Sequence, residues 1–222
     1  MKPLTVVIAT KNAHKFRELK ALLRVPGIRL QSLAAYERIP VVRETGRTFE
    51  ENAVKKARAL ARATGCVVIA DDSGIEVAAL GGAPGVQSAR FAGRHGDDAA
   101  NNRTLLRRLR EVLPSRRGAR YRCVLALASP AKLLAVADGR WAGRIACEPA
   151  GRGGFGYDPI FILPARGKTV AQLPARIKHR LSHRAQAARR MRAALRRLTE
   201  PAQSSLARKC RAPLGARLIG TG

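Results

Sequence analysis

The chain opens with a hydrophobic run, residues 4–10 (LTVVIAT), that is rich in β-branched side chains and predicts a buried strand. A helix is expected next, because Asn12 is a suitable N-cap and apolar side chains then recur at helical spacing as far as Leu23. Pro26 and Gly27 end that element. A strand that leads through a short polar turn into a helix is typical of an α/β fold.

A second helix and strand follow. Thr48 and Glu51 have the spacing of a capping box and predict a helix over residues 48–65. The apolar residues 66–70 (CVVIA) then predict a buried strand that ends before the polar residues after it. Open α/β sheets usually hold their ligands at such strand ends, so a site is expected there.

The remaining pattern predicts a loop, two helices and three strands. In chain order these are a glycine-rich loop over residues 81–96, a helix over 105–113, strands over 121–128 and 133–137, a strand over 157–163 and a helix over 184–198. The turn between the first two of these strands favours antiparallel pairing, which makes the sheet mixed. We therefore expect one α/β domain over residues 1–198, followed by a basic, flexible tail over 199–222.

Charge and composition leave two classes of protein open. The chain has 43 Lys and Arg against 15 Asp and Glu, a formal net charge of +28, and such a surface attracts nucleic acid. Aromatic residues make up only 4% of the chain, too few for a base-stacking platform, so a solvated basic surface is the simpler interpretation. Nucleic acid is not a required partner here, although weak nonspecific binding through residues 199–222 is expected.

The hydrophobic runs also indicate the compartment. None approaches the roughly 18 residues of a membrane span, and the start of the chain lacks the pattern of a cleaved signal. We expect a cytoplasmic protein without a membrane partner. The four cysteines are too far apart for a CxxC metal or redox motif.

A polar cluster at the start of the first helix suits a polyphosphate. It combines backbone amides with the Thr10 hydroxyl, the Asn12 amide and the Lys15 ammonium group. A simpler interpretation is that Asn12 only caps the helix and that Lys15 is solvated.

Carboxylates form the second kind of candidate. Asp71 and Asp72 follow an apolar strand directly, where repulsion and desolvation cost free energy that a divalent cation would offset. Glu44 precedes a flexible Gly and has no evident structural role, which makes it a candidate metal ligand. The alternative for the two aspartates is a polar turn in which they cap backbone amides.

A third group lies near the end of the domain. Glycines at 153, 154 and 156 would let backbone approach a ligand, and Phe155 offers a face for a flat ring. Asp158 and His183 could then contact the polar edge of a base. The alternative is a β-bulge with a core Phe, together with Ser182 as the N-cap of a basic helix.

Taken in order, these segments resemble the inosine/xanthosine triphosphate pyrophosphatase family. The longest matching block is ADDSGIEVAALGGAPGVQSARFAG at residues 70–93; the others are ATKNAHKFREL, ETGRTFEENAVKKA, GGFGYDPIF and SHRAQA. The resemblance implies an elongated mixed α/β sheet in two lobes with a central nucleotide cleft. It also implies Mg²⁺-dependent hydrolysis of the nucleoside triphosphates ITP, dITP and XTP to the monophosphate and pyrophosphate, by a homodimer.

The resemblance also implies roles for particular residues. Asp72 is the expected proton acceptor and, with Glu44, the expected Mg²⁺ ligand. The expected substrate-binding residues are Thr10, Lys11, Asn12, Ala13, His14, Lys15, Ser73, Phe155, Gly156, Tyr157, Asp158, Lys178, His183 and Arg184.

The sequence departs from the family pattern at three places. Lys11 stands where a small Gly is usual, Gln172 stands where an acid is usual, and Pro174 with several basic residues makes the approach to Lys178 atypical. Two other functions remain alternatives, a nucleic-acid-binding protein and a phosphomonoesterase with Asp71 or Asp72 as its nucleophile.

Overall fold

The computed structural model describes residues 3–10, 12–36 and 39–200. Its strands are β1 (Leu4–Ile8), β2 (Ile28–Ser32), β3 (Val67–Val77), β4 (Gly118–Ala128), β5 (Leu133–Ile145), β6 (Phe161–Leu163) and β7 (Lys168–Thr169). Its α-helices are α1 (Ala13–Leu22), α2 (Phe49–Thr64), α3 (Asp98–Arg108), α4 (Ala175–Leu181) and α5 (His183–Thr199). Short 3₁₀ helices connect them, among them η3 (Gly85–Arg90) and η5 (Asp158–Ile160).

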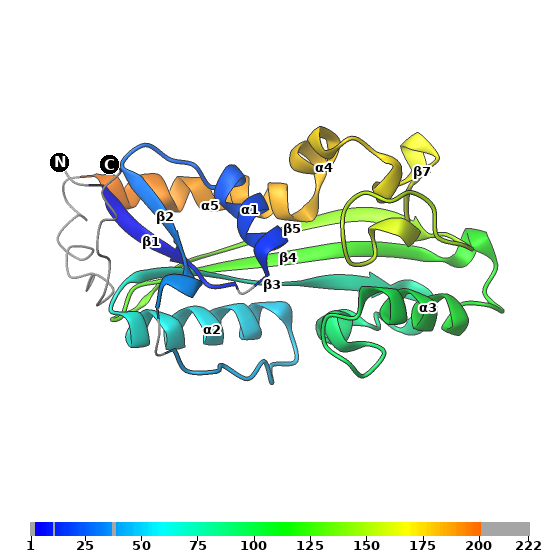
Figure 1. The fold of residues 1–222 in the computed structure, drawn as a ribbon, viewed down its shortest axis with the longest axis horizontal. Helices are drawn as coiled ribbons and strands as arrows, with labels where there is room; N and C mark the ends of the chain where they lie inside the picture. Colours follow the sequence, from blue (N-terminus) through cyan, green and yellow to red (C-terminus); the bar gives the residue numbers. More distant parts are fainter. Residues whose placement is uncertain (1–2, 11, 37–38, 201–222) are drawn as a thin grey trace, which may run out of the picture.

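The strands form one mixed sheet in the order β2-β1-β3-β4-β5-β6-β7. β1 is parallel to both of its neighbours, and every other pair of adjacent strands is antiparallel. The expected antiparallel pairing of the strands around Ser129 is therefore confirmed. β3, β4 and β5 run the length of the molecule and connect its two lobes (Figure 1). The predicted mixed α/β architecture is confirmed.

β3 is longer than its apolar run predicted. The strand does not end at Ala70 but continues through Asp71 and Asp72 to Val77. The reason lies in β4, whose backbone pairs with β3 along this whole length, so polar side chains do not interrupt the ladder. The two aspartates consequently lie in the middle of a long strand and not in a turn after it.

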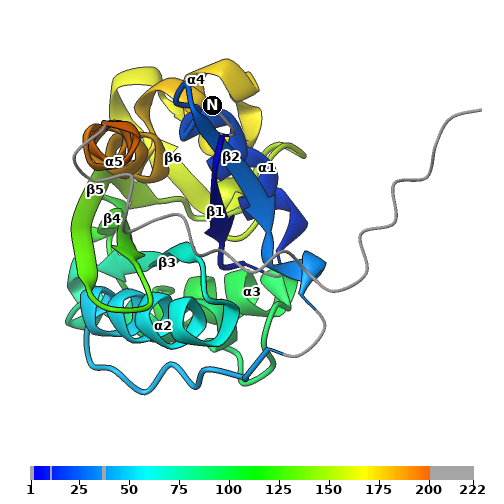
Figure 2. The ribbon, with the colours of Figure 1, turned by 90° about the vertical axis from the view of Figure 1, so that its left-hand side faces the viewer.

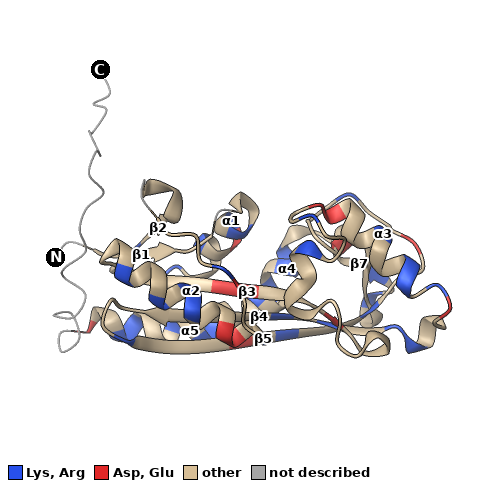
Figure 3. Cartoon of the chain, turned by 90° about the horizontal axis from the view of Figure 1, so that it is seen from below, with Lys and Arg blue, Asp and Glu red and all other residues tan. Residues whose placement is uncertain are grey.

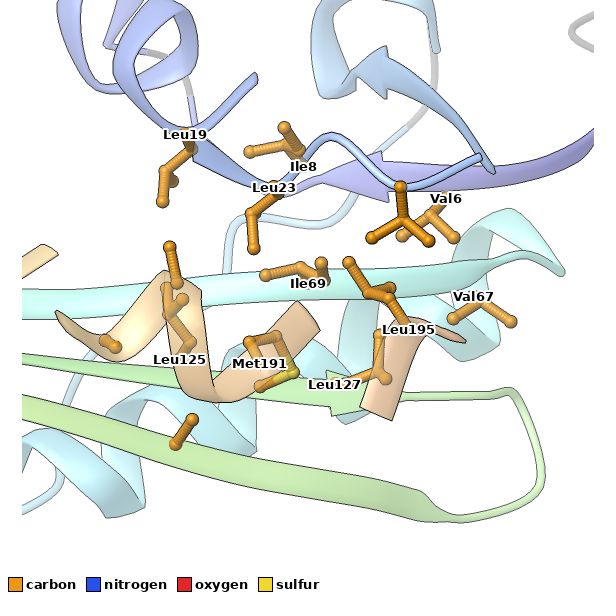
Figure 4. Close-up of a cluster of buried hydrophobic side chains, with 14 of the residues drawn as sticks. Val6, Ile8, Leu19, Leu23, Val67, Ile69, Leu125, Leu127, Met191 and Leu195 are labelled. Carbon is orange, nitrogen blue, oxygen red and sulfur yellow. The ribbon is translucent and has the colours of Figure 1, made fainter. Parts of the chain in front are cut away.

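The first lobe has a hydrophobic layer on each face of the sheet. α1 and α5 pack on one face, where Leu19, Met191 and Leu195 are fully buried against Ile69 and Leu125 (Figure 4). α2 covers the opposite face with small residues, so that the sheet lies between α5 and α2 (Figure 2). Successive side chains of a strand point to opposite faces of the sheet, so each long strand contributes residues to both hydrophobic layers.

The second lobe encloses a separate core around Phe161, Ile75 and Trp141. Two predictions failed here. The helix expected over 105–113 spans Asp98–Arg108, since Asp97 caps it earlier than the apolar spacing indicated. The strand expected over 157–163 is only β6, because its first residues form η5, with a Pro in the first turn.

Other differences are smaller. The loop expected over 81–96 contains η3, and β2 and α4 were not predicted. No helix in the described ranges is long and apolar enough to cross a membrane. β3 carries acidic residues near the middle of the molecule, with basic residues on the surrounding helices (Figure 3). The proposed basic tail lies almost entirely outside the described residues.

Candidate active site

A cavity of about 550 Å³ opens where the edge of β3 loses its partner strand. β1 pairs with β3 only as far as Ile8 and Ile69, and in the described part of the chain no strand continues that pairing. Side chains from both faces of β3 therefore reach the cavity around this edge. The candidate residues that line it are Thr10, Asn12, Lys15, Glu44, Asp72, Ser73, Phe155, Gly156, Tyr157, Asp158, Lys178, His183 and Arg184.

Three candidates are not in that set. Ala13 does not line the cavity, and His14 lines a second cavity of about 410 Å³ that shares Phe155 and Lys178 with the first. The rings of His14 and Phe155 lie 5.8 Å apart. Lys11, which departs from the family pattern, lies outside the described residues.

The first segment at the cavity is the turn from β1 into α1. The side chain of Asn12 accepts a hydrogen bond of 3.0 Å from the backbone N–H of Lys15, so the predicted N-cap is confirmed. Asn12 N–H donates to Thr10 Oγ1 at 3.2 Å, which shapes the turn. Thr10, Asn12 and Lys15 of this turn all line the cavity.

Asp71 is a buried carboxylate with a cationic partner. Its Oδ2 atom lies 3.0 Å from Lys15 Nζ and accepts a hydrogen bond of 3.3 Å from Ser73 Oγ. Burial alone would raise the pKa of Asp71, but the charges of Lys15, Lys56 and Arg184 hold it well below its usual range. Asp71 is therefore ionised throughout the physiological range and compensates the cations around it.

Asp72 has the opposite electrostatic environment, since successive strand residues face opposite ways. It is 7% exposed, and its Oδ2 atom accepts a hydrogen bond of 2.9 Å from Asn52 Nδ2 on α2. Burial and the nearby charge of Glu44 raise the pKa of Asp72 to about 6, although the Asn52 bond acts against this shift. A carboxylate with this pKa is a stronger base than an ordinary Asp and is still ionised at pH 7.

Glu44 pairs with Lys56 of α2, whose Nζ atom lies 2.7 Å from Glu44 Oε1. Burial lowers the pKa of Lys56, but Asp71 and Glu44 more than offset this effect and raise it, so Lys56 is charged. Lys56 and Asn52 were not predicted as site residues. A signal existed, because Asn52 and Lys56 lie one turn apart on the helix, beside positions that are mostly apolar and buried.

The loop before η5 presents Phe155 to the cavity. Asp158 Oδ2 accepts a hydrogen bond of 2.9 Å from Phe155 N–H and lies 2.5 Å from Lys178 Nζ. Gly154 has a φ of +78°, and a Cβ atom there would lie 2.1 Å from Asp158 Oδ2, so only Gly fits. Lys178 Nζ is 4.1 Å from the centroid of the Phe155 ring, and Arg184 Cζ is 5.5 Å from it.

His183 and Arg184, at the start of α5, are almost fully buried beside this ring. His183 stacks on Tyr121 with a centroid distance of 4.6 Å, and its Nδ1 atom has no partner in the described residues. Burial and the nearby charges of Arg184 and Lys178 lower the pKa of His183 well below its ordinary value, so the imidazole is neutral. Arg184 Nη2 donates to Ser73 Oγ at 3.3 Å and thus connects α5 to β3.

Glu18 is a further residue that was not predicted. Its carboxylate binds Arg184 and lies 3.4 Å from Lys178 Nζ. Burial raises the pKa of Glu18, but the charges of Arg184 and Lys178 outweigh this effect. The net pKa is lowered, so Glu18 is ionised. Its place in α1 three residues after Lys15 was the only signal in the sequence.

The two remaining departures from the family pattern have structural roles. Gln172 Oε1 accepts a hydrogen bond of 2.9 Å from Thr169 N–H and stabilises its own short turn. Pro174 is the N-cap of α4, which places Lys178 against Asp158. The atypical approach to Lys178 thus still brings its ammonium group to the Phe155 ring.

A two-lobed mixed sheet with this polar cleft defines a nucleotide-hydrolase type of site, and sequence comparison agrees. The model of the Ham1 family matches residues 6–194, so this chain belongs to the Ham1 family. It is 52% identical over 182 residues to the dITP/XTP pyrophosphatase of Geobacillus kaustophilus (strain HTA426), covering 82% of this chain and 89% of that one. The dITP/XTP pyrophosphatase of Bacillus licheniformis is 46% identical over 190 residues, covering 86% of this chain and 97% of that one.

Solved structures agree with this assignment. A HAM1 protein from Coxiella burnetii superposes with a TM-score of 0.80 at 40% identity, covering 87% of this chain and 99% of the other. The dITP/XTP pyrophosphatase structure from Mycobacterium abscessus gives a TM-score of 0.69 at 41% identity, covering 88% and 99%. The family resemblance predicted from the sequence is confirmed.

Proposed function

We propose that this protein hydrolyses the non-standard purine nucleoside triphosphates ITP, dITP and XTP to the monophosphate and pyrophosphate, and so keeps deaminated purines out of DNA and RNA. The observation that carries the proposal is the layout of the cavity. A basic carboxylate, Asp72, lies at one end among cations, and an aromatic ring with two cations, Phe155, lies at the other. The names of the relatives support the same chemistry.

Mg²⁺ is the cofactor that the donor set fits. Asp72 and Glu44 are hard oxygen donors beside one cavity, and the charge of Glu44 raises the pKa of Asp72, a repulsion that a cation would offset. No cluster of three or more His, Cys, Asp or Glu in the described residues forms a complete cage, and Mg²⁺ ordinarily takes one or two carboxylates plus phosphate and water. When bound, Mg²⁺ neutralises phosphate charge and makes water more acidic.

The side chains around the carboxylates then have distinct tasks. Asn52 binds Asp72 Oδ2, which leaves Oδ1 as the atom that accepts a proton from the attacking water. Lys15 and Lys56 are placed to neutralise the triphosphate, as hydrolysis at phosphorus depends chiefly on charge stabilisation and alignment. Asp71 keeps Lys15 in position through its ion pair.

The base end of the cavity favours a 6-keto purine. Phe155 offers a stacking face, and the nearby Lys178 and Arg184 side chains carry hydrogen-bond donor groups and no acceptor atom. A 6-keto oxygen can accept a hydrogen bond from them. The 6-amino group of adenine is itself a donor, so it would face these donors without forming a hydrogen bond. The site should therefore bind hypoxanthine or xanthine in preference to adenine.

A direct assay tests this function. Pyrophosphate and phosphate release from ITP, dITP, XTP, ATP and GTP would be measured with Mg²⁺ or with EDTA, with Asp72→Asn as the inactive control. We expect Mg²⁺-dependent release of pyrophosphate from the first three substrates. Release of single phosphates would favour the phosphomonoesterase alternative, and full activity of the variant would refute the role of Asp72.

Homodimeric assembly, a cytoplasmic location and weak binding of nucleic acid through residues 199–222 stay predictions from the sequence. Light scattering on the purified chain tests the first. Deletion of residues 201–222 tests the last, because it should abolish any binding of RNA or DNA at low salt and leave hydrolysis intact.

A further inference from the structure

The start of α3 holds the loop that carries Phe155, although the two segments are more than fifty residues apart. Asp98 Oδ2 accepts a hydrogen bond of 2.6 Å from Gly156 N–H, and Asn102 Nδ2 donates one of 3.0 Å to the Gly156 carbonyl oxygen. Both backbone groups of Gly156 are thus bound by side chains one helical turn apart.

These bonds are not needed to form the helix. Asp97 is the N-cap and accepts a hydrogen bond of 2.9 Å from Ala100 N–H, which leaves the Asp98 carboxylate for the loop. Asn101 has a different partner, since its side chain binds Ala92 N–H at 2.8 Å. The four side chains therefore have separate tasks: Asp97 caps α3, Asn101 binds the segment around Ala92, and Asp98 and Asn102 hold Gly156.

The consequence concerns the direction of the Phe155 ring. A peptide group is planar, so a bond to Gly156 N–H orients the whole Phe155–Gly156 peptide, and a bond to the Gly156 carbonyl orients the next one. Gly156 has a φ of +65°, in the region open to Gly, and has no side chain to fix it otherwise. The ring must stay above Lys178 and Arg184, to which it lies close.

We propose that Asp98 and Asn102 are positioning residues for base recognition, holding Phe155 at the angle at which a purine stacks. The proposal rests on the proposed function and deepens it, because it assigns to α3 a contribution to binding of the base and none to the phosphates. Asp98 also lines the cavity, near Tyr157. Burial and the charge of Asp98 both raise the pKa of Tyr157. Tyr157 OH donates to Ser88 O at 2.8 Å, which holds the other end of the loop.

The test compares neighbours on one helix. Asp98→Ala and Asn102→Ala are the test variants. Asp97→Ala, which removes the N-cap of α3, and Asn101→Ala, which removes the bond to Ala92, are matched controls that leave the bonds to Gly156 in place. For each, KM and kcat with ITP, the inhibition constant of inorganic tripolyphosphate and the Tm would be measured. Tripolyphosphate has no base, so it reports on the phosphate end alone.

We expect Asp98→Ala to raise KM for ITP about tenfold, as for the loss of a hydrogen bond to a charged group, with kcat and tripolyphosphate inhibition close to wild type. Asp98→Asn should restore most of the KM, because its amide oxygen still accepts from Gly156. The controls should lower Tm and leave KM unchanged.

The proposal would be overturned if a test variant and a control with a similar Tm had the same KM for ITP. It would also be overturned if a test variant lost affinity for ITP and for tripolyphosphate to the same extent. Absence of pyrophosphate release from ITP by the wild-type protein would instead overturn the proposed function, and with it this inference.

Discussion

Replacement of Asp72 by Asn should inactivate the protein and make it more stable. The wild-type carboxylate is ionised at neutral pH in an environment that disfavours the charge, since burial and Glu44 raise its pKa from 3.8 to about 6. An amide of the same shape removes that cost and can still accept the hydrogen bond of Asn52. Asp71→Asn is the matched control with the opposite sign, because it would leave Lys15 without its ion pair.

The size of the effect follows from linkage. A pKa raised by this amount corresponds to about 3 kcal/mol of destabilisation at pH 7 to 8, where Asp72 is ionised in both the folded and the unfolded protein. As the pH falls from 6 toward 3.8 the folded protein takes up the proton first, so the cost is progressively removed. Below 3.8 both states are protonated and the variant has no advantage. For a domain of this size the gain equals a Tm rise of about 6–12 °C.

Urea unfolding in EDTA between pH 4 and pH 8 measures this difference, with Mg²⁺ excluded so that no cation compensates the carboxylates. We expect Asp72→Asn to exceed wild type at pH 8 and to approach it near pH 4, and Asp71→Asn to be less stable than wild type at neutral pH. A gain below about 1 kcal/mol at pH 8, or one that persists at pH 4, would refute the electrostatic reasoning.

Three further predictions concern the same cavity. Without a bound cation the pKa of Asp72 is about 6. Because Asp72 must be ionised, kcat/KM at limiting Mg²⁺ should fall toward low pH, and Glu44→Gln should shift this limb of the pH profile to lower pH. In metal titrations, Glu44→Gln should also raise the Mg²⁺ concentration for half-maximal rate about tenfold. Phe155→Ala should raise KM for ITP about tenfold through lost stacking; an unchanged KM would exclude Phe155 as the base platform. Gly154→Ala should lower Tm and raise KM, because its Cβ atom would meet Asp158, whereas Gly82→Ala, in open space at a similar φ, should affect Tm alone.

Local signals in the sequence were enough for much of the fold. The turn from β1 into α1 was predicted because an apolar run and an N-cap such as Asn12 act over a few residues. The helix α2 followed in the same way from Thr48, which caps it by accepting from Glu51 N–H. The segments that line the cavity could also be named in advance, since polar residues at the ends of apolar runs are visible without a structure.

The sequence by itself thus determined the order of the main elements, the mixed sheet and the segments that carry the candidate residues of the cleft. Only the tertiary structure decided how adjacent, identical residues differ. Asp71 pairs with Lys15, and nearby cations lower its pKa. Asp72 binds Asn52, and burial together with the charge of Glu44 raises its pKa, which makes it the stronger base. The extension of β3 past Ala70 was likewise decided by pairing with β4. Hydrogen bonding across a sheet and the electrostatic field of a buried site both depend on groups distant in the chain, which no local pattern records.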